Sequence, residues 1–212
     1  MEDEFSKRKN DVLSKLDKSF IGGWDEKIVE LCKEINKSEN YYTTSSCAGR
    51  VVLIIDQERK EAGLFVKVYH DLISFEELKE GLGEIVKIPP RSPGHPPLTS
   101  ARKTRDIDKL VHPNLIRFKM ESCILHVACR TLEDAQLLFD KAKLAGWKRS
   151  GIISSGNRVM LELNSTEKLE FPIVAGGEII VDDKFLKIVV KSANEKLEKS
   201  WKKIEGLKSL VE

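Results

Sequence analysis

Groups that can hold an anion are concentrated in one short stretch of the chain, Thr43–Arg50. The stretch carries a run of hydroxyls, the thiol of Cys47, the flexible Gly49 and the guanidinium of Arg50. Glycine-containing turns present backbone N–H groups to anions, and an arginine holds a phosphate or carboxylate at two points. Since a helical pattern precedes the stretch and a strand pattern follows it, we expect an anion-binding turn; the alternative is a turn whose hydroxyls satisfy only its own backbone. The candidate binding residues are Ser45, Ser46, Cys47, Gly49 and Arg50.

Two further side chains are of types that can take part in reactions. Cys47 is a candidate nucleophile because a nearby guanidinium lowers the pKa of a thiol, and the alternative is a small buried thiol. His126 lies in the apolar stretch Cys123–Cys129 and is followed by Arg130. It can be a general base or a hydrogen-bonded histidine of the core.

Apolar periodicity predicts the elements that must position these residues. Spacing of three and four predicts helices over 5–20, 25–35, 74–82, 131–145 and 183–207. Strand patterns occupy 51–55, 64–69, 115–119, 123–129, 151–154, 158–163, 169–173 and 179–181, the last four as a meander. The sequence Gly81-x-Gly83 follows a helical segment, where a dinucleotide-binding motif needs a preceding strand. We therefore expect an α+β fold with mixed sheets flanked by helices, and no Rossmann cofactor site.

One internal similarity suggests a duplication. The segment Ser45–Leu53 resembles Ser154–Leu161, since both have paired serines that lead into a strand through an arginine. If the match is real, the chain contains two duplicated α/β halves whose serine turns face each other across a cleft. Chance similarity is the alternative.

The charge balance does not single out nucleic acid as a partner. Charged residues make up 33% of the 212 residues, yet the net charge is only +2, so both signs are interspersed. The four cysteines lack CxxC spacing, which favours a reducing compartment and predicts no bound metal. No stretch approaches the roughly 20 apolar residues of a membrane helix. We expect a cytoplasmic protein without a membrane partner.

The segment 87–113 differs in composition from the rest of the chain, because it is rich in proline and in basic residues. Proline cannot continue a helix or donate to a sheet, so we expect a long loop inserted into a single domain that spans 1–212. The insertion either grips RNA through Arg102, Lys103 and Arg105 or is a tolerated surface loop.

The combination of these features resembles the tRNA wybutosine-synthesizing protein 3 family, in particular its archaeal members. The resemblance covers nearly the whole chain except the proline-rich insertion. Two departures concern an expected aromatic, which here is Phe65 or a neighbour, and an expected Glu-Pro pair, which here is Glu121-Ser122. The matching residues are Phe5, Lys9, Tyr42–Arg50, Glu121, Ile124–Val127, Arg130, Ala135, Leu138, Ala142, Gly146, Ser150–Ile152, Ser165, Thr166, Pro172, Ala193 and Asn194.

The resemblance implies an unusual α/β fold and a methyltransferase activity. Members of the family resemble enzymes that use S-adenosyl-L-methionine to methylate N(4) of 7-(3-amino-3-carboxypropyl)-4-demethylwyosine at position 37 of tRNA(Phe). This activity implies the anticodon loop of tRNA(Phe) as partner and a role in wybutosine biosynthesis. The unusual fold implied by the resemblance, which lacks the common methyltransferase sheet, agrees with the missing dinucleotide motif.

The resemblance also implies roles for the candidate residues. The stretch Ser45–Arg50 with Ser150 and Gly151 would hold the cofactor carboxylate or the aminocarboxypropyl group of the base. His126 would receive or relay the N(4) proton, and Arg130 would contact an anion. Tyr42 would stack on RNA, with core packing as its alternative.

Two other functions stay open at the level of sequence. The first is a non-catalytic RNA-binding protein that recognises the modified anticodon loop. The second is a cysteine-dependent transferase that uses Cys47.

Overall fold

The chain forms two compact units. The structure, a computed structural model, describes residues 3–15, 25–55, 65–87, 115–156 and 158–212. The first unit consists of Met1–Gly49, Ser122–Glu167 and Glu198–Glu212, and the second of Arg50–Glu121 and Lys168–Leu197. No helix in the described part of the chain is long and apolar enough to cross a bilayer.

A four-stranded antiparallel sheet is the centre of the first unit. Its strand order is β1-β5-β7-β6, so the two edge strands are β1 and β6. The helices of this unit are α1, α2, α4 and the C-terminal part of α5. The bounds are α1 Glu4–Leu13, α2 Val29–Lys37, β1 Tyr41–Cys47, β5 Ile124–Cys129, α4 Leu132–Leu144, β6 Gly151–Ser154, β7 Val159–Asn164 and α5 Asp183–Val211.

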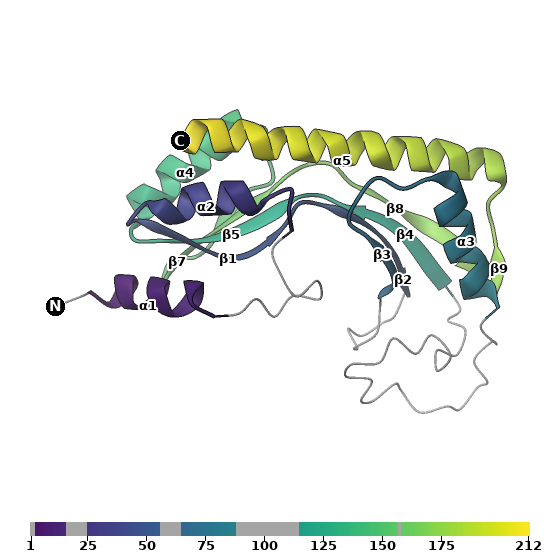
Figure 1. The fold of residues 1–212 in the computed structure, drawn as a ribbon, viewed down its shortest axis with the longest axis horizontal. Helices are drawn as coiled ribbons and strands as arrows, with labels where there is room; N and C mark the ends of the chain where they lie inside the picture. Colours follow the sequence, from purple (N-terminus) through teal and green to yellow (C-terminus); the bar gives the residue numbers. More distant parts are fainter. Residues whose placement is uncertain (1–2, 16–24, 56–64, 88–114, 157) are drawn as a thin grey trace, which may run out of the picture. The chain divides into compact units, whose positions relative to one another are not determined.

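One face of this sheet is buried and builds the core of the unit. Side chains of a strand alternate between faces, and in β5 Leu125 and Val127 are fully buried while His126 between them is half-buried. Figure 1 shows α2 and α4 on the buried side of the sheet and α1 on the other side. The core packs apolar residues of the strands, of these two helices and of α5 around Trp147, whose indole N–H donates to the carbonyl of Lys203 at 3.0 Å.

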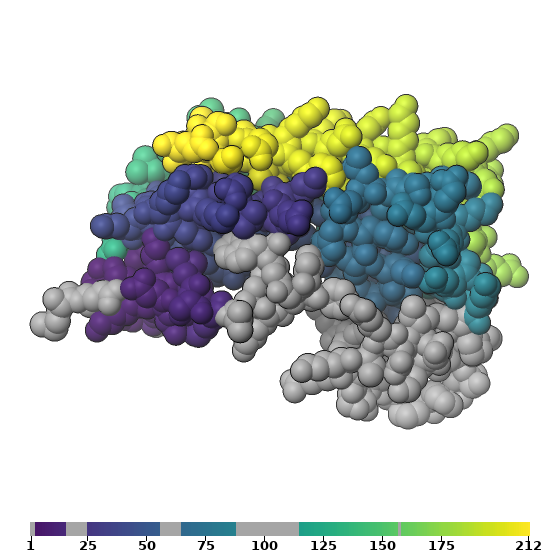
Figure 2. Space-filling model, viewed as in Figure 1, coloured from purple at the N-terminus to yellow at the C-terminus, as the bar shows by residue number. Residues whose placement is uncertain are grey.

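The opposite face of the sheet is covered in part by α1. Phe5 and Val12 of this helix pack on Tyr42, Ala128 and Met160, which form one row across three strands. In Figure 2, α1 in purple lies directly against the dark blue segment of α2 and β1. The next row of the face is partly exposed to solvent, since the side chains of His126 and Glu162 are half-buried.

The second unit contains a five-stranded antiparallel sheet with the order β3-β2-β4-β8-β9. Helix α3 buries Leu78, Leu82 and Ile85, and the first part of α5 belongs to the same unit. Asn194 of α5 binds the backbone of Ile73 twice, accepting from its N–H at 3.0 Å and donating to its carbonyl at 2.8 Å. The bounds are β2 Arg50–Ile55, β3 Phe65–Tyr69, α3 Phe75–Val86, β4 Leu115–Glu121, β8 Leu169–Ala175 and β9 Glu178–Ile179.

The α+β class and the flanking helices expected from the sequence are confirmed. The sheets, however, are antiparallel in every described pair and not mixed. The expected meander is also wrong, because β6 and β7 pair in the first sheet whereas β8 and β9 pair in the second. The proline-rich insertion expected at 87–113 lies, apart from Lys87, outside the described residues, and so do Arg102, Lys103 and Arg105.

The stretch Thr43–Arg50 is not the expected turn. Strand β1 continues through Cys47, and only Ala48 and Gly49 connect it to β2, with Gly49 at a φ of 99° that favours glycine. The stretch forms a strand because hydrogen bonds hold Thr43 against α2. Asn36 of that helix accepts from the backbone N–H of Thr43 at 2.8 Å and donates to the Thr43 hydroxyl at 3.0 Å. Pairing with β5 then extends along the strand.

The structure does not support duplicated α/β halves. In the segment after Ser154, β6 and β7 form an antiparallel pair within one sheet. In the segment after Ser45, β1 and β2 belong to different sheets and do not pair. Ser45 and Ser46 lie within the edge strand β1, whereas Ser154 ends the other edge strand β6 and Ser155 follows it, so the similarity does not reflect equivalent elements.

Candidate functional site

The half-exposed face of the first sheet carries a row of residues from all four strands, polar in three of them and glycine in β6. The strand register places Ser45 opposite His126, His126 opposite Glu162, and Glu162 opposite Gly151. A β-bulge in β1 between Thr43 and Ser45 determines this alignment. In regular pairing, without the bulge, Thr44 would stand opposite His126, so the bulge places Ser45 there instead.

Hydrogen bonds connect this row from edge to centre. The Oγ of Ser45 lies 2.7 Å from Nδ1 of His126, and Nε2 of His126 lies 2.9 Å from a carboxylate oxygen of Glu162. The side chains of His126 and Glu162 are 29% and 30% exposed. An ionised carboxylate only accepts hydrogen bonds, so a neutral His126 carries its proton on Nε2 and accepts from the Ser45 hydroxyl at Nδ1. The row can therefore take up a proton at Nδ1.

The row is open at its β6 end and has exposed hydroxyls at its β1 end. No atom outside the immediate chain neighbours would come within 4 Å of a Cβ atom added to Gly151. Ser45 is exposed, and so is Thr44 in the bulge, whose hydroxyl contacts the carbonyl of His126 at 3.4 Å. The row thus presents a hydroxyl at its accessible end and a histidine behind it.

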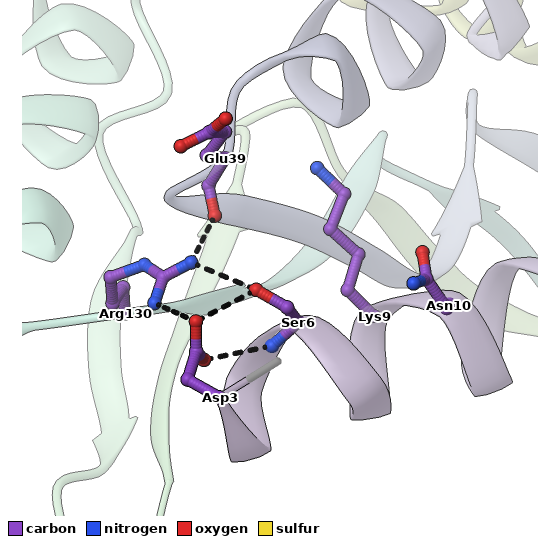
Figure 3. A pocket seen from close by; sticks show the side chains of 6 residues that line it. All are labelled: Asp3, Ser6, Lys9, Asn10, Glu39 and Arg130. Carbon is purple, nitrogen blue, oxygen red and sulfur yellow. Dashed lines mark hydrogen bonds and ion pairs between the residues drawn. The ribbon is translucent and has the colours of Figure 1, made fainter. Parts of the chain in front are cut away.

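A polar pocket of about 390 Å³ lies on the same unit between α1 and the strand ends (Figure 3). This volume falls in the range of small-molecule sites. It combines two cationic, two acidic and two neutral polar side chains. Its lining residues are Asp3, Ser6, Lys9, Asn10, Glu39 and Arg130.

Arg130 is the central cation of this pocket. Its guanidinium donates to the carboxylate of Asp3 at 3.0 Å, to the hydroxyl of Ser6 at 3.2 Å and to the carbonyl of Glu39 at 3.1 Å, and it lies 4.8 Å from the ring centre of Phe5. The backbone N–H of Ser6 and then Arg130 hold the pKa of Asp3 well below its usual range. Arg130 therefore already secures the first turn of α1.

Lys9 supplies the second cation. Its ammonium donates to the carbonyls of Asn36 at 2.7 Å and Ser38 at 2.5 Å, where α2 ends. Burial lowers the pKa of Lys9, and the nearby Glu39 opposes this effect. A helix C-terminus favours a cation, so Lys9 fixes α1 to α2 while it lines the pocket.

Arg50 is engaged within the second unit. Its Nε donates to the carboxylate of Glu121 at 2.7 Å, on the neighbouring strand β4, and its guanidinium lies 4.7 Å from the ring centre of Phe65. The expected single turn that gathers Arg50 with the serines is not present, because Arg50 begins β2. The departure noted at Phe65 thus falls on a residue that packs against Arg50.

The other residues of the expected anion site do not converge on one point, because they lie on both faces of the sheet. Ser46 faces the side opposite to Ser45 and bonds the thiol of Cys32 in α2. Cys47 is half-buried in the row next to Ser45, and Gly49 is buried in the connection to β2. Among the described hydroxyls of this stretch, Ser45 bonds the ring of His126, whereas Thr44 contacts only its carbonyl.

Ser150 and Tyr42 have contacts that correct their expected roles. The hydroxyl of Ser150 donates to the carbonyl of Trp147 at 2.7 Å and accepts from the backbone N–H of Asn164 at 3.1 Å, so its proton is not available to a ligand. Tyr42 is fully buried with its ring 5.1 Å from that of Phe5. A base of RNA cannot stack on a ring that α1 already covers, so the core alternative holds for Tyr42.

Glu162 is the residue of the row that sequence reasoning missed. It stands between the buried Leu161 and Leu163, so a carboxylate interrupts an apolar strand. This interruption of the apolar pattern is the feature of the sequence that could have identified Glu162 as a functional residue. Its partner could not be identified without the register of β5 on β7, and the same holds for the acidic residues that line the pocket.

Comparisons with known proteins agree on one family. A sequence profile described as Methyltransferase TYW3 matches residues 7–212. The tRNA(Phe) 7-((3-amino-3-carboxypropyl)-4-demethylwyosine(37)-N(4))-methyltransferase of Archaeoglobus fulgidus is 34% identical over 89% of this chain and 83% of its own. The tRNA wybutosine-synthesizing protein 3 homolog of Xenopus laevis is 31% identical over 99% of this chain and 75% of its own. The solved structure of the PH1069 protein from Pyrococcus horikoshii superposes with a TM-score of 0.77 at 29% identity, over 97% of this chain and 92% of its own.

Proposed function

The chain belongs to the Methyltransferase TYW3 family, and from this premise we propose that it methylates N(4) of 7-(3-amino-3-carboxypropyl)-4-demethylwyosine at position 37 of tRNA(Phe). The observation that carries the proposal is the family match over residues 7–212. Archaeal and vertebrate relatives whose names state this reaction or wybutosine synthesis support it. The reaction belongs to wybutosine biosynthesis, and we propose the cytoplasm as its place.

We propose S-adenosyl-L-methionine as the methyl donor. When bound, it supplies a methyl group activated on a positively charged sulfur, and the transfer requires an in-line arrangement with the accepting nitrogen. The pocket at Arg130 has charges that suit an amino acid group, with Arg130 and Lys9 for a carboxylate and Asp3 and Glu39 for an ammonium. A bound group would share Arg130 and Lys9 with their present protein partners. Both the cofactor and the aminocarboxypropyl side chain of the base carry such a group, so the pocket suits either one.

The row on the open face is our proposed reaction site. Methylation of N(4) releases a proton, and a positioned base contributes to such steps by roughly 10²–10⁴-fold. His126 has the required acceptor in Nδ1, and Glu162 accepts from its Nε2 at 2.9 Å. Ser45 and Thr44 are exposed at the β1 end of the row, so we propose that the base approaches from this edge of the sheet.

The RNA itself is held by further contacts. A base in the anticodon loop can be splayed from its neighbours and read outside the stack. We propose Arg102, Lys103 and Arg105 of the insertion as phosphate contacts, although they lie outside the described residues. Their contribution is expected to weaken as salt rises, because phosphate binding releases counterions.

Mass analysis of the modified nucleoside tests the proposed function. The protein is incubated with S-adenosyl-L-methionine and tRNA(Phe) that carries the demethyl precursor, and the nucleosides are then released. We expect the precursor to gain the mass of one methylene group, with the cofactor converted to S-adenosylhomocysteine. Tight tRNA binding without this gain would favour the non-catalytic RNA-binding alternative.

A further inference from the structure

Both ring nitrogens of His126 are already occupied by protein groups. Nδ1 faces the Oγ of Ser45 at 2.7 Å, and Nε2 faces Glu162 at 2.9 Å. A substrate nitrogen therefore has no unoccupied ring nitrogen to reach in this arrangement. The accessible end of the chain of bonds is the hydroxyl of Ser45, which lies on the edge strand β1 and is exposed.

We infer that Ser45 is the catalytic residue that contacts the methylated nitrogen and relays its proton to His126, while Glu162 is a positioning residue that fixes the tautomer of the histidine. This inference rests on the proposed function. It changes the role expected for His126, which becomes the acceptor at the end of a relay instead of a direct contact of the base.

The steps of the relay balance in atoms and charge. As N(4) forms its bond to the methyl carbon, the bond from that carbon to sulfur breaks with its electron pair moving to sulfur. The N(4) proton passes to Oγ of Ser45, and the hydroxyl proton of Ser45 passes to Nδ1 of His126. The resulting imidazolium keeps the proton on Nε2, where it is hydrogen-bonded to Glu162. It later releases the proton on Nδ1 to water, so the protein returns to its starting state.

The charged surroundings of the ring support a single direction of transfer. Among the described residues of β1, β6 and β7, the charged group that faces His126 is Glu162 on β7. Strand β1 instead presents the hydroxyl of Ser45 and, one row away, the thiol of Cys47. The cations of the neighbouring pocket are bonded elsewhere, Arg130 to Asp3 and Lys9 to carbonyls of the chain. A carboxylate on the far nitrogen favours the tautomer that accepts from Ser45.

The β-bulge supports the assignment of Ser45. It inserts Thr44 so that a small primary hydroxyl stands opposite His126, and bulges often re-aim a side chain beside an active site. The strand would pair with β5 in regular register without it. The extra residue therefore serves the contact between Ser45 and the ring.

The first test reads the histidine directly and needs no catalysis. Nitrogen-15 NMR of the wild-type protein is expected to show neutral His126 as the Nε2-protonated tautomer. In Glu162→Gln the amide can either accept from or donate to Nε2, so a mixture of both tautomers is expected. A wild-type ring protonated on Nδ1, or a Glu162→Gln spectrum identical to the wild type, would overturn the role of Glu162.

The second test reads the relay in single-turnover methylation of the precursor tRNA. Ser45→Ala is expected to slow the transfer by roughly 10²-fold or more with unchanged affinity for S-adenosyl-L-methionine, and Ser45→Thr should restore most of the rate. Ser154→Ala is the matched control, because Ser154 is an exposed serine on the other edge strand, one row away on the same face. An active wild type whose Ser45→Ala variant is equally fast overturns the relay alone. A wild type with the expected tautomer but no methyl transfer overturns the proposed function, and the relay with it.

Discussion

At the scale of single residues, the chemistry of the protein depends on contacts across strands. Ser45 and His126 could be selected from the sequence because a hydroxyl-rich stretch and a histidine in an apolar strand are visible there. Glu162 could not be paired with them, because partners on neighbouring strands depend on register. Ser46 was expected to join Ser45 in one site, because the two are adjacent in sequence. In the strand, however, Ser45 faces the open side of the sheet and Ser46 faces α2.

The buried thiols yield a residue-scale prediction. Burial raises the pKa of Cys32, Cys123 and Cys129 to about 12, so these thiols stay neutral and unreactive near pH 8. Cys47 is half-buried, and we expect it to be alkylated first in the native protein. Intact-mass analysis after treatment with iodoacetamide should show one added group, and all four additions only after unfolding. Rapid labelling of all four in the native state would contradict the burial of this core.

The pair of Glu167 and Lys203 gives a prediction about pH. Burial tends to raise the pKa of Glu167, but hydrogen bonds from Lys203 and Ser165 outweigh this effect and lower it. The stabilisation is therefore present above the unfolded pKa of the carboxyl and is lost as pH falls through its lower folded pKa. We expect Glu167→Gln to reduce the free energy of unfolding at pH 7 by about 1–3 kcal/mol, and by less in acid.

Urea denaturation at pH 7 and at successively lower pH measures this difference. Asp11→Asn is the control, because both side chains of the Asp11–Lys15 ion pair are exposed to solvent. Its effect should stay below about 0.5 kcal/mol. A Glu167→Gln deficit that grows as pH falls would have the wrong sign for the proposed linkage.

At the scale of elements, α1 is the part of the first unit held mainly by polar contacts. It has no fully buried residue, and Arg130 and Lys9 secure it at the strand and helix ends. The sequence predicted this helix through its apolar spacing, yet it also predicted that Tyr42 would be available to RNA. Tyr42 is covered because α1 packs on it, a tertiary contact between Phe5 and a strand far along the chain.

Removal of the Arg130 side chain is expected to loosen α1 selectively. Arg130→Ala loses three hydrogen bonds to the region of Asp3, Ser6 and Glu39, so the amides of α1 should exchange with deuterium faster while those of β5 stay protected. Arg8→Ala is the control, since Arg8 pairs with Glu4 on an exposed surface of the same helix. Uniformly faster exchange throughout the first unit would contradict a local role.

At the scale of the whole molecule, the class of fold could be predicted but the allotment of strands to sheets could not. Thr131 and Asp134 cap α4 as expected from their spacing, and Gly146 with a φ of 90° follows its end, because these signals are local. The change of sheet between β7 and β8 depends on pairings between distant segments. Helix α5 contributes residues to both units, and we propose that they act together as one domain.

The most direct measurement is the rate at which the precursor nucleoside at position 37 gains a methyl group, for the wild type and for His126→Ala side by side. Isothermal calorimetry with S-adenosyl-L-methionine on both proteins separates binding from transfer. We expect the wild type to add one methyl group, and His126→Ala to bind the cofactor normally but transfer roughly 10²-fold more slowly or worse. Equal rates for the two proteins would contradict the assignment of the reaction to the row of Ser45, His126 and Glu162, and an inactive wild type would contradict the function itself.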